Sequence, residues 1–150
     1  MKAMRMAVVA AVVISAAAQS HAPVSDKESL IGAWRLVSIT GPDGKPVSEG
    51  VPQGMLIYTR DGHMSVQLMF SEVANAQSNE YVNNGYEASF GSYDVNEATR
   101  VLTHHVQGSV TRGLLVGKNL PRIYQFSAAG PLMIRSARTD EHWSVTWEHY

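Results

Sequence analysis

Two apolar, β-rich segments meet at an Asp61-Gly62 pair, and this junction constrains the fold more than any other feature of the sequence. A glycine at such a junction adopts the positive φ angle of a tight hairpin turn at no steric cost. The sequence therefore predicts that residues 55–60 and 63–70 pair as antiparallel strands. Apolar and polar side chains alternate along the second strand, which gives it one dry face. A hairpin with one dry face indicates a sheet that curves over a core.

Similar β-rich stretches recur along the chain at short spacing. We predict further strands at residues 33–40, 86–95, 100–107, 110–116, 120–126, 132–137 and 142–148. Residues 71–84 break this pattern. Ser71 can cap the start of a helix and Asn84-Gly85 can end it, so we predict one short helix or lid there. The predicted fold class is all-β, a single antiparallel up-and-down β-barrel of about eight to nine strands.

The first 22 residues have the features of an export signal. Lys2 and Arg5 precede an uninterrupted apolar stretch at 7–18, and Ser20-His21-Ala22 supplies the small residues that precede a cleavage site. The apolar stretch is shorter than the roughly 20 residues that span a bilayer as a helix. We therefore expect a cleaved signal peptide at 1–22, one domain at 23–150, no membrane span in the mature protein, and a periplasmic or secreted location.

Charge and composition argue against several classes of function. The chain has 12 basic and 13 acidic residues without a basic stripe, so we expect no nucleic-acid partner. It has no cysteine, which excludes disulfides, thiol chemistry and a lipoprotein anchor. A metal site needs three or four converging ligands, and the histidines lack the spacing for one. No glycine-rich phosphate loop is present, and we expect neither a metal nor a cofactor.

Five segments resemble, in order, the bacterial lipocalin-like domain family. They are Gly32-Ala33-Trp34, the run from Gly54 to Leu68, Phe90-Gly91-x-Tyr93-x-Val95, Val101-x-x-His104-His105-Val106 and the closing Trp147-Glu148. The resemblance implies a calycin-type small barrel with an internal cavity. It also implies a role for Arg122, which sits where the family usually has an arginine after the Gly117 turn.

His104 is the candidate catalytic residue. His104 and His105 are adjacent on a predicted strand, so only one of them can point into the cavity. We expect His104 inside because its face also carries Leu102 and Val106. A histidine there could act as a general base or orient a polar ligand group. The alternative is a structural histidine bonded to a neighbouring strand or to water.

Arg122 alternates with Tyr124 and Phe126 on one face of its strand. If that face is inside, the guanidinium would bind a carboxylate, enolate or phenolate on an otherwise apolar ligand. A buried unpaired arginine is costly, so the inside position requires an anionic partner. If that face is outside, Arg122 is solvated. The full set of expected ligand-binding residues is Arg122, His104, Tyr58, Tyr93, Tyr124 and Met64.

The tryptophans and methionines are expected to lie on strands. Trp143 and Trp147 share one face of the last predicted strand, which should pack against Trp34 and close the barrel. The methionines of the mature chain could line an adaptable cavity or fill the core, and they are Met55, Met64, Met69 and Met133.

Two functions remain open from the sequence. The first is an exported protein that binds a small, mostly apolar molecule, which carries an acidic group if Arg122 points inward. The second is an isomerase or cyclase for such a molecule, with His104 as acid or base, Arg122 stabilising an oxyanion, and Tyr58 or Tyr93 assisting. A third, weaker alternative is a filled barrel that binds proteins through its surface. Fold alone does not choose between them.

Overall fold

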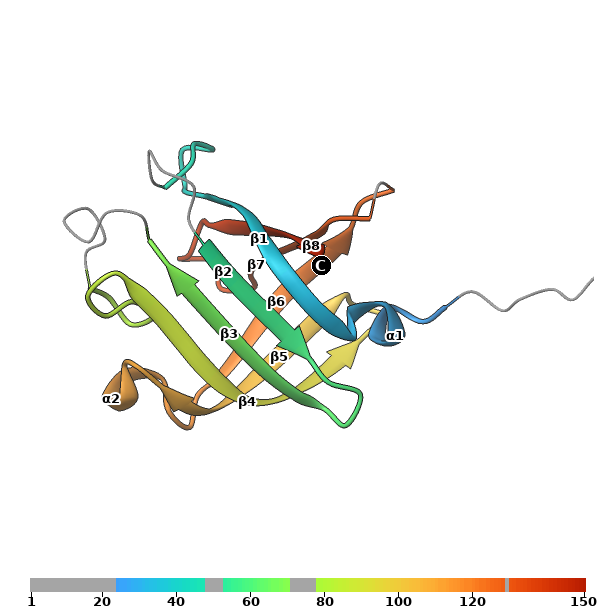
Figure 1. The fold of residues 1–150 in the computed structure, drawn as a ribbon, viewed down its shortest axis with the longest axis horizontal. Coiled ribbons are helices and arrows are strands. Elements are labelled where there is room, and N and C mark those ends of the chain that lie inside the picture. Colours follow the sequence, from blue (N-terminus) through green and yellow to red (C-terminus); the bar gives the residue numbers. More distant parts are fainter. Residues whose placement is uncertain (1–23, 48–52, 71–77, 129) are drawn as a thin grey trace, which may run out of the picture.

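A computed structural model describes residues 24–47, 53–70, 78–128 and 130–150. Eight antiparallel strands form a closed barrel in chain order, with the last strand beside the first (Figure 1). They are β1 (Gly32–Thr40), β2 (Gln53–Tyr58), β3 (His63–Met69), β4 (Tyr86–Asn96), β5 (Val101–Ser109), β6 (Asn119–Phe126), β7 (Leu132–Ser136) and β8 (Ser144–His149). The predicted up-and-down barrel is confirmed.

The two short helices are not where the sequence predicts one. They are α1 (Asp26–Leu30) and α2 (Arg112–Leu115). The strand predicted at 110–116 is therefore wrong, because α2 occupies most of that range. Of the helix or lid predicted at 71–84, residues 71–77 lie outside the described residues, and 78–84 contain no helix. In the described part of the chain no helix is long and apolar enough to cross a bilayer.

The hairpin at Asp61-Gly62 forms as predicted and sets the inward face of β3. Gly62 adopts a φ of 89°, and Tyr58 pairs with Met64 across the turn. Inward and exposed residues then alternate along β3, with Val66 buried and Gln67 exposed. The other strands follow the same period of two except at irregularities in β1, between Leu36 and Ser38, and in β4, between Phe90 and Gly91. The barrel interior therefore receives a side chain from nearly every second position.

One end of the barrel is closed by α1. Ser25 caps the helix by accepting a hydrogen bond from the Glu28 amide, and Leu30 is completely buried. The indole N–H of Trp34 donates to the Leu30 carbonyl oxygen at 2.8 Å, and the Tyr124 hydroxyl donates to Asp26 Oδ2 at 2.9 Å. These contacts attach the helix to the first and sixth strands, so this end of the interior is filled.

The three tryptophans belong to one hydrophobic cluster beside the β1–β8 pairing that closes the barrel, as the sequence predicts. Trp34 and Trp147 both belong to the buried core, and Trp34 stacks on His149, with 3.5 Å between ring centroids. Trp143 precedes β8 and is only partly buried, at the end of the barrel opposite α1. β8 begins two residues later than the predicted strand, so Trp143 lies just before it, and it lines the same cavity as Trp147.

Candidate functional site

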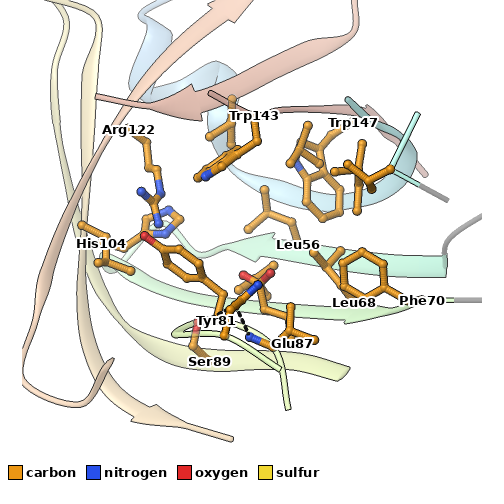
Figure 2. Close-up of a pocket in the computed structure, with 18 residues that line it drawn as sticks. Leu56, Leu68, Phe70, Tyr81, Glu87, Ser89, His104, Arg122, Trp143 and Trp147 are labelled. Atoms are coloured by element: carbon orange, nitrogen blue, oxygen red, sulfur yellow. Dashed lines mark hydrogen bonds between the residues drawn. The ribbon is translucent and has the colours of Figure 1, made fainter. Parts of the chain in front are cut away.

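The end of the barrel opposite α1 contains a cavity of about 410 Å³ (Figure 2). Its walls come from the inward faces of the strands, and its rim from the segments that connect them at this end. Phe70, Tyr81, Val82 and Trp143 contribute to the rim. A volume of this size is sufficient for one small organic molecule.

The polar side chains that strands contribute to this cavity lie on one wall, where Leu120 of β6 is an apolar neighbour. The polar wall is formed by three neighbouring strands, with Glu87 and Ser89 on β4, His104 on β5 and Arg122 on β6. The opposite wall runs from β7 round to β3 and is wholly apolar, formed by Ile134, Val145, Trp147, Ile39, Leu56, Val66 and Leu68. The cavity therefore has a polar side and an apolar side along its length.

His104 lies inside the barrel, and its ring is hydrogen-bonded to Tyr58, which belongs to the core on the α1 side of the cavity. The Tyr58 hydroxyl lies 2.7 Å from Nε2 of His104. Burial, with the nearby Arg122 and His105, lowers the pKa of His104 to about 3, while burial raises the pKa of Tyr58 well above its usual value. Both groups are therefore uncharged near neutral pH, and a single hydrogen bond joins the Tyr58 hydroxyl to Nε2 of His104, its direction set by the tautomer of the imidazole. This protonation state makes His104 a hydrogen-bonding group rather than a general base near neutral pH.

Arg122 also points inward and is almost fully buried. Its guanidinium carbon lies 4.8 Å from the Trp143 ring centroid and 5.3 Å from that of Tyr81, which is cation–π distance. Nη1 lies 3.4 Å from Ser136 Oγ and 3.7 Å from Glu141 Oε2. The anionic partner that a buried arginine requires is therefore supplied by this chain, through Glu141.

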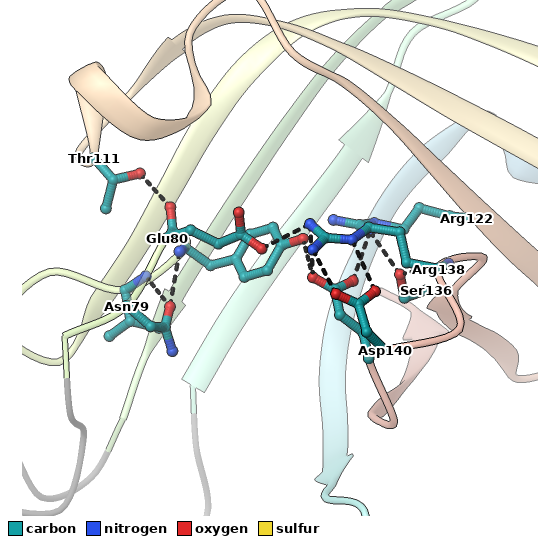
Figure 3. A network of polar contacts seen from close by, with 10 residues as sticks. Asn79, Glu80, Thr111, Arg122, Ser136, Arg138 and Asp140 are labelled. Carbon is teal, nitrogen blue, oxygen red and sulfur yellow. Dashed lines mark hydrogen bonds and ion pairs between the residues drawn. The ribbon is translucent and has the colours of Figure 1, made fainter.

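Glu141 belongs to a polar network at the rim (Figure 3). Its Oε1 accepts a hydrogen bond from the Tyr81 hydroxyl at 2.6 Å and lies 3.3 Å from Nη1 of Arg138. Arg138 also pairs with Glu80 Oε1 at 2.9 Å. On the other side, the Thr111 hydroxyl donates to the Glu80 carbonyl oxygen at 2.7 Å. Residues 79–82 are thus fixed at both sides of the cavity mouth, and we call them the strap.

Glu87 is the polar residue of the cavity that the sequence analysis missed. Its side chain is partly buried and faces the cavity, whereas Asp94 on the same strand is exposed and contacts His105 outside. Within the described residues the Glu87 carboxylate has neither an ion pair nor a hydrogen-bond partner. Burial raises its pKa to about 7, and Arg122 opposes that rise. The signal in the sequence was the alternation that puts Glu87 on the face of Ser89 and Tyr93.

The other expected site residues lie inside the barrel, but in the core between the cavity and the end that α1 closes. Tyr93 donates to the Thr59 carbonyl oxygen, and Tyr58 and Tyr124 bond His104 and Asp26 as described above. Met64 is buried in the same core cluster. None of these four is among the residues that line the cavity. All four side chains point inward, but a period of two does not tell how deep along the barrel a side chain lies.

The methionines fill the core or lie on the outer surface rather than lining the cavity. Met55 and Met69 are exposed on the outer face of the barrel, and Met133 is partly buried. Among the described residues there is also no group of three or more histidine, aspartate or glutamate side chains that could hold a metal ion.

Comparison with known proteins agrees with this architecture. The sequence profile of the lipocalin-like domain family matches residues 31–149. No curated protein matches the sequence. Among solved structures, a redesigned β-barrel is 11% identical, covers 85% of this chain and 99% of its own, and gives a TM-score of 0.48. A mutant of the fluorescent protein UnaG is 10% identical, covers 82% of this chain and 97% of its own, and gives a TM-score of 0.43.

Proposed function

Since this chain belongs to the lipocalin-like domain family, we propose that it binds a small, mostly apolar molecule in the barrel cavity. The observation that carries the proposal is the cavity of about 410 Å³ with an apolar wall facing a polar wall. Contact with the apolar wall contributes affinity in proportion to the area removed from water, about 25 cal/mol per Å². The polar wall fixes how the ligand is oriented.

The proposal includes export of the protein. The positive residues, the apolar stretch and the small residues at 20–22 are the parts of a cleavable signal. A binding protein that acts in the periplasm or outside the cell would meet its ligand there. Amino-terminal sequencing of protein recovered from the periplasm or medium tests this step. We expect it to begin at or near Pro23, and an intact Met1 on exported protein would contradict it.

The isomerase or cyclase alternative has less support from the cavity. The low pKa of His104 keeps its ring a neutral imidazole near neutral pH, which is a weak general base and lacks the acidic proton of an imidazolium. Tyr58 and Tyr93 use their hydroxyl groups in bonds to His104 and to the backbone of Thr59. These contacts suit a binding cavity with fixed polar groups better than a proton-transfer site.

Two tryptophan substitutions on one strand test the binding proposal. Val66 faces the cavity, and its neighbour Gln67 faces outward. Val66→Trp should fill the apolar wall, whereas Gln67→Trp adds the same side chain on the outer surface. The probe is the neutral fluorophore N-phenyl-1-naphthylamine, titrated into the wild-type protein and both variants.

We expect saturable binding of the probe to the wild type and to Gln67→Trp, and a loss of about tenfold or more in affinity for Val66→Trp. Circular dichroism controls for folding of each variant. Equal affinity in both variants would contradict binding inside the barrel. Absence of saturable binding to the wild type would contradict the proposed function for apolar ligands of this size.

A further inference from the structure

We propose that the ligand carries a protonated amine and that Glu87 is the carboxylate that binds it. The proposal rests on the proposed function, because it names the chemical class of the molecule held in the same cavity. It replaces the acidic group suggested by Arg122 alone. Three observations support it: the partner of Arg122, the unbalanced carboxylate of Glu87, and the composition of the wall that faces it.

The positive charge in the cavity already has a negative neighbour. Arg122 Nη1 lies 3.7 Å from Glu141 Oε2, and both side chains are largely buried. Two aromatic rings, Tyr81 and Trp143, lie close to its guanidinium. Removing a partner from a buried ion pair is strongly unfavourable, so a ligand would have to compete with Glu141 rather than fill an empty position. An acidic ligand is therefore not needed to neutralise Arg122.

Within the ranges that the structure describes, the negative charge of Glu87 has no such neighbour. Among the described residues, the charged side chain that lines the cavity with Glu87 is Arg122, which is already paired. The two other titratable groups of the lining, His104 and Tyr81, are uncharged near neutral pH. An ionised Glu87 thus leaves the cavity with one uncompensated negative charge. A cation would neutralise it, whereas an anion would add a second one.

The surroundings of Glu87 fit an amphipathic amine rather than a small hydrophilic cation. Leu68 is the register partner of Glu87 on β3, and the apolar wall begins there. An ammonium at Glu87 would therefore continue into an alkyl or ring system packed on β1, β2 and β3. Burial keeps the pKa of Glu87 near 7 without a ligand. An opposite charge within a few ångströms favours the ionised form of a carboxyl group.

Three eight-carbon probes distinguish the sign of the ligand charge at equal apolar content. They are octylamine, 1-octanol and octanoate, used as competitors of bound N-phenyl-1-naphthylamine at about pH 8, where Glu87 and octanoate are ionised and octylamine is protonated. The protein variants are Glu87→Gln and, as a matched control, Asp94→Asn on the outer face of the same strand.

We expect octylamine to displace the fluorophore at a concentration about 30-fold or more below that of octanoate. Glu87→Gln should abolish this preference and Asp94→Asn should keep it, with each competition referred to that variant's own measured affinity for the fluorophore. The proposal is overturned if octanoate competes best, or if Glu87→Gln leaves the octylamine preference unchanged. Failure of the fluorophore itself to bind the wild type would instead count against the proposed function.

Discussion

The hydroxyl group of Tyr58 lies 2.7 Å from Nε2 of His104, across the interior of the barrel. The two residues come from β2 and β5, which are not neighbours in the sheet. His104 lines the cavity, whereas Tyr58 belongs to the filled core below it. This bond therefore marks the floor of the cavity and separates the part of the barrel that can take a ligand from the part that holds the fold together.

Tyr58→Phe removes the hydroxyl group from that bond and leaves the buried Nε2 of His104 without its partner. An unsatisfied buried polar atom costs about 1–3 kcal/mol, so we expect the free energy of unfolding to fall by that amount. Chemical denaturation of the variant measures it. Tyr150→Phe is the control, because Tyr150 is 71% exposed. Equal losses in the two variants would show that the bond to His104 adds no stability.

His104 should make the protein less stable as the pH falls. Its pKa is about 3 in the folded state, against about 6.5 for a histidine in an unfolded chain. Between these values the unfolded state binds a proton that the folded state does not. The free energy of unfolding should then decrease by up to about 1.4 kcal/mol per pH unit as the pH falls from 6.5 towards 3. Urea unfolding over this range should show a shallower slope for His104→Gln. Parallel curves would contradict the low pKa.

Glu87 should have the opposite effect in the range above its unfolded pKa. Its folded pKa is about 7, and the value for an ordinary glutamate is 4.5. As the pH rises from 4.5 to 7, the unfolded state loses a proton that the folded state keeps, so stability falls. The free energy of unfolding of Glu87→Gln, measured relative to the wild type, should therefore be higher at about pH 8 than at about pH 4. A pH-independent difference between the two proteins would contradict the raised pKa.

The pairing of Arg122 with Glu141 can be measured by a double-mutant cycle. Arg122→Met should destabilise the protein because Glu141, whose carboxylate is largely buried, loses the guanidinium beside its Oε2 atom. Arg122→Met combined with Glu141→Gln should cost less than the sum of the two single changes. We expect a coupling of about 1 kcal/mol or more from denaturation curves. Additive losses would show that Arg122 is not balanced by Glu141, and would reopen the case for an acidic ligand.

The sequence predicted the barrel and the inward faces of β3 and β5 from a period of two, and it left open which face of β6 points inward. The inward position of His104 was predicted from that period. The sequence did not predict how far along the barrel axis each side chain lies. Tyr93, Tyr124 and Met64 were therefore expected at the cavity and are found in the core. Depth depends on how α1 fills one end of the barrel. The Ser25-x-x-Glu28 pattern is a helix start signal, and it was overlooked beside the predicted signal peptide.

The partners of the cavity residues were also beyond the sequence pattern. Glu141 lies in the connection between β7 and β8, and Tyr81 lies in the strap. Neither segment has a regular period that would show which way its side chains point. Their contacts with Arg122 arise only when the closed barrel brings these two connections to the same end. The sequence pattern therefore could not show that Glu141 lies beside Arg122 as an anionic partner.

The central claim is that a small apolar molecule binds inside the barrel, and intermolecular nuclear Overhauser effects test it most directly. The sample is the wild-type protein saturated with N-phenyl-1-naphthylamine. We predict contacts from the aromatic protons of the probe to the methyl groups of Val66, Leu68 and Val145, which line the cavity. Contacts confined to Val37 and Val116, which are exposed, would contradict the claim.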